Sequence, residues 1–300
     1  MVLEGRMNTP ANPLVSIITP TYNRADFIGQ AVNSVLAQTY TNFELLIVDD
    51  GSTDNTLDVL KSALADSRVR YFHQENQGQS VARNLALSEA KGDFVCFLDS
   101  DNYWPAEKLE HQIELFRRHP DYDVIYGDGI VIDEKDQELT RKNIKRYSGH
   151  IARYMIRDNC VSMNTAMARR RCFDELGVMS GKRRVADDYD LWLRFSARFR
   201  FLYVPEFFAY YRVMDDQISS DKTRRFDSNW QIINDFRREF PDAMSEQEFD
   251  SGFAAFHSRK ARYLASQGSR REALVEMLKT LRLRPLHRAS WRSLAAVLLK

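Results

Sequence analysis

The sequence predicts an α/β fold, Rossmann-like, with a mostly parallel central sheet flanked by helices and a C-terminal all-helical extension. Two observations lead to this prediction. Apolar, β-rich runs alternate with amphipathic runs four times within the first hundred residues, which is the pattern of βαβ units. From about residue 222 onward, apolar residues recur at helical spacing only.

The first hundred residues contain the clearest elements. Short runs rich in Val, Ile, Leu and Phe predict strands over 14–22, 43–49, 69–74 and 93–99. Between them, apolar residues spaced three and four apart predict helices over 25–39, 55–65 and 78–92. A Ser/Thr/Asp cluster precedes the second helix, and such residues cap helix N-termini.

The middle of the chain is less regular. A helix is expected over 105–118, a strand over 123–133, another over 162–170, a helix over 187–198 and an aromatic strand over 199–213. The segment 134–158 is polar and weakly periodic, so we expect it to be mobile. These patterns divide the chain into a disordered leader over 1–13, a sheet domain over 14–218 and a helical extension over 219–300.

In the extension, helices are expected over 222–239, 245–267, 270–283 and 286–299. One unit has small or apolar residues at tetratricopeptide-like positions, namely Gly268, Ala273, Met277 and Pro285. A free-standing array needs about three such units, so we expect a single hairpin packed against the sheet domain.

Composition excludes several classes of protein. With 44% hydrophobic and 28% charged residues, the 300-residue chain is typical of globular proteins. It has no apolar run long enough to span a bilayer and no apolar signal core at its start. Its three cysteines form no CxxC pattern, and its six histidines are scattered. We therefore expect a cytoplasmic protein in a reducing compartment, without a zinc site.

Charge is unevenly distributed. Residues 253–300 contain 11 Lys and Arg but only 2 Asp and Glu, whereas the whole chain has a net charge of +1. Such a tail can contact an anionic surface or be a solvated helix face. We expect no nucleic-acid partner. The terminal helices have three alternatives: peripheral contact with the inner membrane face, docking on another protein, or a homodimer contact.

Polar clusters follow three of the predicted strands, at Thr21–Arg24, Asp49–Ser52 and Asp99–Asn102. The carboxyl ends of parallel strands share one edge of a sheet, where ligands bind. Asp99 and Asp101 either lie in a solvated turn or hold a cation such as Mg²⁺ or Mn²⁺, which prefers oxygen ligands.

Two further acidic pairs allow both a structural and a functional interpretation. After the second strand, either Asp49 or Asp50 can accept the N3–H of a uracil, and Ser52 can bond a ribose or the backbone. The same residues can instead cap the next helix. Asp187 and Asp188 open a predicted helix, where the helix dipole favours carboxylates. A carboxylate facing a cleft can also act as a general base.

Three segments together are similar to family 2 glycosyltransferases, which are inverting enzymes with the GT-A fold that use nucleotide sugars. The resemblance covers about residues 14–215 and rests on "VSIITPTYNRADFIGQAVNSVLAQTYTNFELLIVDDGSTDNT", "NQGQSVARNLALSEAKGDFVCFLDSDN" and "ADDYDLWLRF". It implies a UDP-sugar donor, a Mg²⁺ or Mn²⁺ cofactor and a glycan or lipid-linked acceptor, in cell-surface polysaccharide synthesis.

The resemblance also implies roles for individual residues. Asp101 would bind the metal, Asp99 the ribose or the metal, and Asp188 would be the catalytic base. Arg83 would lie against the base or phosphate. The nucleotide-binding set it implies is Pro20, Thr21, Tyr22, Asn23, Arg24, Asp50, Ser52, Arg83 and Asp99.

The sequence departs from the family pattern at two positions. Asp187 stands where the family has glutamate, and Met214 stands where it often has a histidine that helps bind metal or diphosphate. A thioether is a poor ligand for Mg²⁺ or Mn²⁺. Either Arg212, Asp215 or Asp216 substitutes for the histidine, or the ion relies on Asp101 and the diphosphate alone.

A basic segment precedes the expected base and contains Lys182, Arg183 and Arg184. It could fold over the diphosphate, receive an acceptor, or simply be a solvated loop. Arg212 is a further candidate for the diphosphate.

Other functions fit the sequence less well. A nucleotidyltransferase or a dinucleotide oxidoreductase needs a glycine-rich loop after the first strand, and "TPTYNRADF" contains no glycine. Met214 keeps one alternative open, a catalytically weak or non-catalytic GT-A scaffold that acts through its helical tail.

Overall fold

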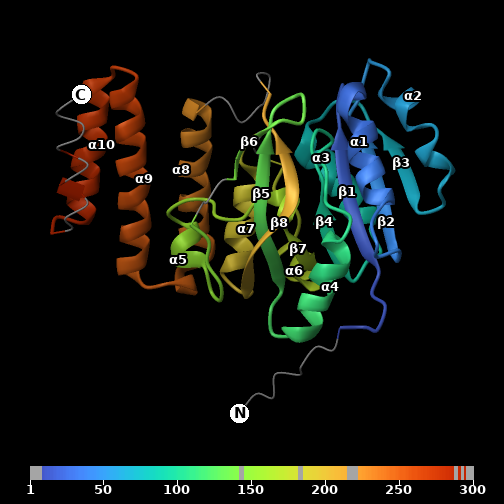
Figure 1. The fold of residues 1–300 in the computed structure, drawn as a ribbon. Coiled ribbons are helices and arrows are strands. Elements are labelled where there is room, and N and C mark those ends of the chain that lie inside the picture. The colour runs from blue at the N-terminus through green and yellow to red at the C-terminus, as the bar shows by residue number, and fades with distance from the viewer. Residues whose placement is uncertain are drawn as a thin grey trace, which may run out of the picture.

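An eight-stranded mixed sheet forms the centre of the protein in the computed structural model, which describes residues 9–141, 145–181, 185–214 and 222–286 with residues 290, 291 and 294 (Figure 1). The strand order is β3-β2-β1-β4-β7-β5-β6, and β8 pairs with β5 off this path. The strands are β1 (Val15–Thr21), β2 (Phe43–Asp49), β3 (Val69–His73), β4 (Phe94–Phe97), β5 (Val124–Ile132), β6 (Glu138–Arg141), β7 (Met167–Arg169) and β8 (Phe201–Arg212).

The first four strands are parallel, as the sequence predicts. In register, Ile17 of β1 lies opposite Leu45 of β2 and Cys96 of β4, and Thr21 lies opposite Asp49. β7 is antiparallel to β4 and β5, β6 is antiparallel to β5, and β8 is parallel to β5. The mostly parallel α/β fold is confirmed, and the polar clusters after β1, β2 and β4 lie at one edge.

Helices cover both faces of the sheet. They are α1 (Ala25–Leu36), α2 (Thr56–Leu60), α3 (Gln79–Glu89), α4 (Lys108–Arg118), α5 (Ala152–Met155), α6 (Arg170–Leu176) and α7 (Asp187–Ser196), followed by α8 (Lys222–Glu239), α9 (Glu246–Ser266) and α10 (Arg270–Leu283). Side chains alternate along each strand: Ile17 faces the core under α1 and α4, whereas Ile18 faces the core under α3 and α7.

The C-terminal helices share the core of the sheet domain. Phe236 of α8 and Phe249 of α9 are 2% and 0% exposed, and they belong to the same apolar cluster as Phe97 and Trp192. α10 packs on the outer side of α9, where Ala261 and Ala265 meet Ala273 and Met277 (Figure 1). The expected hairpin is therefore present and is anchored by α8 and α9. No helix among the described ranges is long and apolar enough to cross a membrane.

Several local predictions were wrong. The expected disordered leader is ordered over 9–13, where the Tyr40 hydroxyl donates to Asn12 and Pro13, and Arg117 donates to Ala11; residues 1–8 lie outside the described part. The segment 134–158, in which no element was predicted, contains β6 and α5. The expected strand over 162–170 is a 3₁₀ turn, Met163–Thr165, followed by the short β7, and α6 was not predicted. Most of the expected helix 286–299 lies outside the described residues.

Candidate active site

The loops after β1 and β2 are tied together by side chains of both polar clusters. The backbone N–H of Asn23 donates to Ser52 Oγ at 2.9 Å, and the Thr53 N–H donates to Asn23 Oδ1 at 2.8 Å. Asn23 adopts a left-handed backbone conformation, with φ of 49°, which asparagine tolerates better than most residues. Ser52, which the resemblance places in the nucleotide site, therefore also fixes the loop that carries Asn23 and Arg24.

Asp50 organises the segment that leads into α3. Its Oδ1 accepts hydrogen bonds from Gln74 Nε2 at 2.6 Å and from the Gln77 N–H at 2.8 Å, and its Oδ2 accepts from the Gly78 N–H at 2.8 Å. A carboxylate has about four lone-pair positions. Oδ2, with a single protein donor, therefore keeps unused acceptor capacity, although Asp50 is 3% exposed.

The residues at the end of β1 differ greatly in exposure. Pro20 and Thr21 are buried within the sheet, and Thr21 Oγ1 has no hydrogen-bond partner among the described residues. Tyr22 is 46% exposed. Of these three members of the expected nucleotide-binding set, Tyr22 offers most of the accessible surface.

Asp99 and Asp101, directly after β4, have different surroundings. Asp99 accepts from Arg83 Nη2 at 2.5 Å and from Asn164 Nδ2 at 2.8 Å, while its own N–H donates to Asn164 Oδ1 at 2.8 Å. The Asp101 carboxylate is partly exposed, and within the described ranges no side chain forms a hydrogen bond or ion pair with it. Removal from water and the nearby Asp99 charge raise the pKa of Asp101 to about 6, although Arg24 and Arg212 act in the opposite direction.

Arg83 joins two of the acidic clusters. Its guanidinium is 3% exposed and donates to Asp187 Oδ2 at 2.7 Å as well as to Asp99. Asp187 also accepts from Ser80 Oγ at 3.0 Å, and its Oδ1 accepts from the Asp188 N–H at 3.0 Å. Arg83 was expected against the base or phosphate; the structure instead places both of its terminal nitrogens on carboxylates, because a buried guanidinium needs charged acceptors.

Asp188 has a freer carboxylate than Asp187. It lies in the first turn of α7, is partly exposed, and its Oδ2 accepts from Asn159 Nδ2 at 2.9 Å. Removal from water, and then the neighbouring Asp187 charge, raise the pKa of Asp188 to about 6, while Arg225 and Arg83 favour the charged form. Such a group is ionised near neutral pH and basic enough to take a proton.

A family model described as "Glycosyl transferase family 2" matches residues 16–177, which is more than half of the chain. A relative from Bacillus subtilis (strain 168), "Putative teichuronic acid biosynthesis glycosyltransferase TuaG", is 32% identical over 75% of this chain and 89% of its own length.

The chain belongs to glycosyl transferase family 2.

Other relatives of this family 2 transferase agree. The Escherichia coli protein "UDP-Glc:alpha-D-GlcNAc-diphosphoundecaprenol beta-1,3-glucosyltransferase WfgD" is 33% identical over 74% of this chain and 86% of its own length. Three glycosyltransferases from Rickettsia species are much longer, because the matched part of this chain spans only 26–30% of their length.

Solved structures share the fold of this family 2 transferase. The crystal structure of S. aureus TarS 1-349 in complex with UDP-GlcNAc matches with a TM-score of 0.71 and 19% identity, over 90% of this chain and 81% of that chain. Mannosyltransferase PcManGT from Pyrobaculum calidifontis, in complex with GDP-Man and Mn2+, matches with a TM-score of 0.62 and 21% identity, over 98% and 89%. The GT-A fold is confirmed.

The acidic edge of this family 2 transferase fits a divalent cation. Asp101 is partly exposed, and no side chain of the described residues donates to its carboxylate, whereas both oxygens of Asp99 already accept side-chain hydrogen bonds. In the described ranges, His, Cys, Asp and Glu form no cluster of three or more that could hold a metal. The protein would thus supply Asp101, with Asp99 beside it, and Mg²⁺ or Mn²⁺ would take its other ligands from water and diphosphate. Bound there, the ion would offset negative charge on the leaving diphosphate.

Arg212 requires a correction. It was a candidate for binding diphosphate, but its side chain is 1% exposed. Its guanidinium donates to the carbonyl oxygens of Asp101 and Asp133, to Gln30 Oε1 and to Asp136 Oδ1, and it lies over the ring of Phe27. In this structure Arg212 therefore fixes the loop after β4 and has no exposed face for a diphosphate. Met214 is 7% exposed. Lys182, Arg183, Arg184, Asp215 and Asp216 lie outside the described residues.

Sequence reasoning missed two asparagines of the site. Asn164 is 3% exposed and clamps Asp99, and Asn159 contacts Asp188. An amide inside the β-rich run "SMNTAM" is unusual and indicates a buried polar partner. No comparable pattern marks Asn159, which follows a polar segment.

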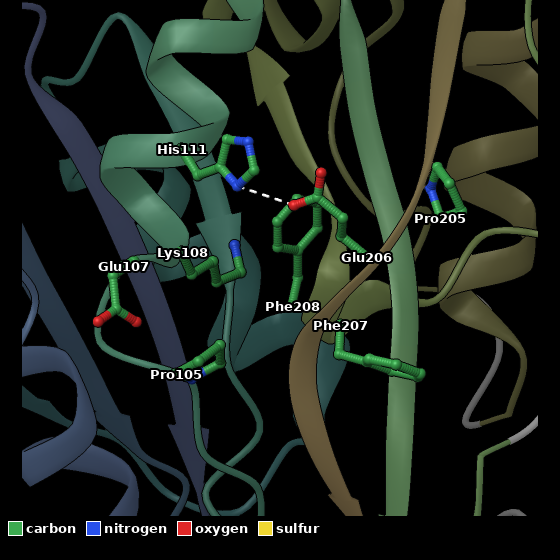
Figure 2. A pocket seen from close by; sticks show the side chains of 8 residues that line it. All are labelled: Pro105, Glu107, Lys108, His111, Pro205, Glu206, Phe207 and Phe208. Atoms are coloured by element: carbon green, nitrogen blue, oxygen red, sulfur yellow. Dashed lines mark ion pairs between the residues drawn. The ribbon is translucent and has the colours of Figure 1, made fainter.

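A separate hollow lies between α4 and β8 (Figure 2). Its volume is about 380 Å³, and an ion pair of 2.8 Å between His111 Nδ1 and Glu206 Oε2 crosses it. None of the predicted site residues lines it. It is therefore distinct from the acidic edge.

Proposed function

We propose that this family 2 transferase moves a sugar from a nucleoside diphosphate sugar to a hydroxyl group, with inversion at the anomeric carbon. A UDP-sugar is the proposed donor. The names of two similar proteins support it, because WfgD is a UDP-Glc transferase and TarS has been solved with UDP-GlcNAc. Asp50 and the exposed Tyr22 are the proposed contacts for the base.

The proposed acceptor is a glycan or a lipid-linked saccharide used for a cell-surface polysaccharide. TuaG is named for teichuronic acid biosynthesis, and WfgD for an acceptor on diphosphoundecaprenol. These similarities cover about three quarters of this chain.

The arrangement at Asp188 is the observation that carries the proposal. Asp188 is a partly exposed residue in the first turn of α7, next to Asp187, and its pKa is raised to about 6. In the proposed step, Asp188 accepts the proton of the acceptor hydroxyl, whose oxygen attacks the anomeric carbon. The bond from that carbon to the diphosphate oxygen breaks, and its electron pair leaves with the diphosphate. A single displacement of this kind inverts the anomeric configuration.

The remaining residues hold this geometry. Arg83 fixes Asp187, whose Oδ1 accepts the N–H of Asp188, so the base is held at the start of α7. The same guanidinium fixes Asp99 next to Asp101. The buried Arg83 thereby links the proposed donor side, at Asp99 and Asp101, to the proposed acceptor side, at Asp188. This link supports the proposal that holding the reacting groups in place contributes to catalysis.

A donor screen tests the proposal. The protein is incubated with UDP-, GDP- and dTDP-sugars, with Mn²⁺ or Mg²⁺, and release of nucleotide is measured. We expect release from a UDP-sugar that is abolished in Asp188→Asn. Activity that survives this substitution would remove Asp188 as the base.

The catalytically weak or non-catalytic scaffold is the second candidate, and Met214 is the observation that favours it. Calorimetric titration with UDP, with and without Mn²⁺, distinguishes the two. Metal-dependent binding that is lost in Asp101→Ala supports the transferase. Absence of binding under both conditions supports the scaffold.

The C-terminal helices are the proposed contact with the inner face of the cytoplasmic membrane. Helix α10 has an exposed stripe at helical spacing, made of Arg271, Val275, Leu278 and Arg282. Within it, Val275 and Leu278 are 52% and 66% exposed. Apolar residues flanked by arginines fit an anionic lipid surface. Such contact would bring a lipid-linked acceptor to the enzyme.

Vesicle sedimentation tests this contact. We expect wild type to bind phosphatidylglycerol vesicles more than phosphatidylcholine vesicles, and a double variant Val275→Asn, Leu278→Asn to lose that binding. The matched control replaces Leu57 and Val59 of α2, which are 44% and 40% exposed. A dimer that the α10 variant dissociates, without vesicle binding, would assign the stripe to a second copy of the chain.

A further inference from the structure

Asn159 lies in the loop after α5 and contacts the proposed base. Its Nδ2 donates to Asp188 Oδ2 at 2.9 Å. The two residues are 29 positions apart in the sequence, so the contact depends on the fold that brings the loop against the start of α7.

The orientation of the Asn159 amide is fixed by its other end. Asn159 Oδ1 accepts the N–H of Val161 at 3.1 Å, in a turn that asparagine commonly forms. A carbonyl oxygen must face that donor, so the NH₂ group must face Asp188. The loop therefore presents a hydrogen-bond donor, and not an acceptor, to the carboxylate.

This contact makes the two oxygens of Asp188 unequal. Oδ2 accepts the Asn159 amide, whereas no side chain among the described residues donates to Oδ1. The backbone N–H of Tyr189, the next residue in α7, also favours the charged carboxylate. Two equivalent oxygens would allow the carboxylate to rotate between them, but a fixed amide holds one of them in place. The oxygen that remains for a substrate hydroxyl is Oδ1.

We infer that Asn159 is a positioning residue for the transfer reaction, which holds Asp188 by Oδ2 and directs the acceptor's proton to Oδ1. The inference rests on the proposed role of Asp188 as base. When the hydroxyl O–H bond breaks, its proton bonds to Oδ1 and its electron pair stays on the attacking oxygen. The amide keeps its own hydrogens throughout, so it orients the base without exchanging a proton.

The charges around Asp188 come from three helices. Asp187 of α7 raises its pKa, while Arg83 of α3 and Arg225 of α8 lower it. The Asn159 amide adds a neutral donor to the charged form, and such a donor favours ionisation. Its loss should therefore shift the acidic limb of activity to higher pH.

Asn159→Asp is the sharpest test, because aspartate can still accept the Val161 N–H while its second oxygen faces Asp188 in place of NH₂. We expect the apparent pKa of the acidic limb of kcat/KM to rise by about 1–2 units, since two facing carboxylates retain a shared proton. Asn159→Ala, which removes the donor without adding a charge, should raise it by about 0.5–1 unit and lower kcat several-fold, with the donor KM unchanged.

Asn42→Asp is the matched control. It makes the same chemical change at a partly exposed residue just before β2, whose amide donates to the Asn12 carbonyl oxygen. The acidic limb should stay within about 0.3 unit of wild type in this variant. Unfolding in urea, measured for all variants, shows whether the fold is retained.

The outcomes separate the inference from the proposed function. If Asp188→Asn is inactive but Asn159→Asp keeps the wild-type pH profile, the inference is wrong and the base assignment stands. If Asp188→Asn is active, the base assignment itself is wrong. The pKa of the Asp188 carboxyl group can be measured without a sugar donor, from the ¹³C NMR shift of its carboxyl carbon in wild type and Asn159→Asp. An unchanged pKa would overturn the inference.

Discussion

Arg83 Nη2 lies 2.5 Å from Asp99 Oδ1, and this contact joins helix α3 to the turn after strand β4. The second terminal nitrogen of the same guanidinium lies 2.7 Å from Asp187, at the start of α7. Arg83 is 3% exposed, so both ion pairs are shielded from solvent on the arginine side. One buried cation therefore sets the spacing between the acidic edge and the proposed base.

Replacing Arg83 with methionine should strongly destabilise the protein. Two carboxylates would lose their shared partner, and breaking a buried pair in this way costs about 3–5 kcal/mol. Urea unfolding at pH 7.5 measures the change. The control is Arg70→Met, because Arg70 pairs with Glu89 and Glu44 but is 32% exposed; it should cost about 1 kcal/mol or less. Equal losses in the two variants would contradict a special role for Arg83.

Asp101→Asn should stabilise the protein while removing metal-dependent nucleotide binding. The folded-state pKa of Asp101 is raised to about 6, so the folded protein binds this proton more tightly than the unfolded chain does. Its ionisation therefore costs stability, and this cost develops as pH rises from about 4 to 6. With allowance for partial exposure, the gain above pH 6 should be about 1–2 kcal/mol.

Asp99→Asn provides the contrast. It weakens the ion pair with Arg83, so we expect a loss of stability at pH 7.5. Urea unfolding of both variants, together with UDP titrations with and without Mn²⁺, checks the pair of predictions. If Asp101→Asn and Asp99→Asn changed the free energy of unfolding in the same direction, the proposed difference between a destabilising Asp101 charge and a stabilising Asp99 charge would be wrong.

Asp188 should control the pH dependence of transfer. Since a general base must be ionised and the pKa of Asp188 is raised to about 6, kcat/KM should fall about tenfold for each pH unit below 6. Asp188→Asn should reduce kcat by at least about 10²-fold. Nucleotide release measured between pH 5 and 8 at saturating metal tests both. A profile that is flat down to pH 5 would exclude this carboxylate as the titrating group.

Arg212→Met should act mainly on stability. The substitution removes the donor to four acceptors, two of them backbone carbonyl oxygens, at a cost of about 3 kcal/mol. If Arg212 fixes the loop and does not touch the diphosphate, the affinity for UDP at low temperature should change less than threefold. A large loss of UDP affinity with normal stability would restore the earlier assignment to the diphosphate.

Sequence patterns predicted the parallel half of the fold well. Alternating apolar runs located β1 to β4 and their helices, since strands buried on both faces must be continuously apolar. The antiparallel half was harder to predict, because β6 is exposed throughout and β7 has only three residues. Neither gives a period-two pattern long enough to recognise.

The site was predicted in part, and the reason lies in its contacts. Acidic pairs at strand ends indicated where Asp50, Asp99 and Asp101 would lie. Whether an arginine faces a ligand or a carboxylate depends on residues distant in sequence; Asp187 lies 104 positions from Arg83. Partners at that separation leave no local pattern, so Arg83 and Arg212 were assigned to the ligand when they bind the protein.

The shared core of α8, α9 and the sheet has a consequence for synthesis. A nascent chain emerges from the ribosome N-terminus first, and domains generally fold as they appear. Here Phe236, Phe249 and Phe256 complete the apolar cluster around Trp192. Until those phenylalanines have left the exit tunnel, the apolar surface around Trp192 stays exposed on the growing transferase, and exposed apolar surface of this kind promotes aggregation.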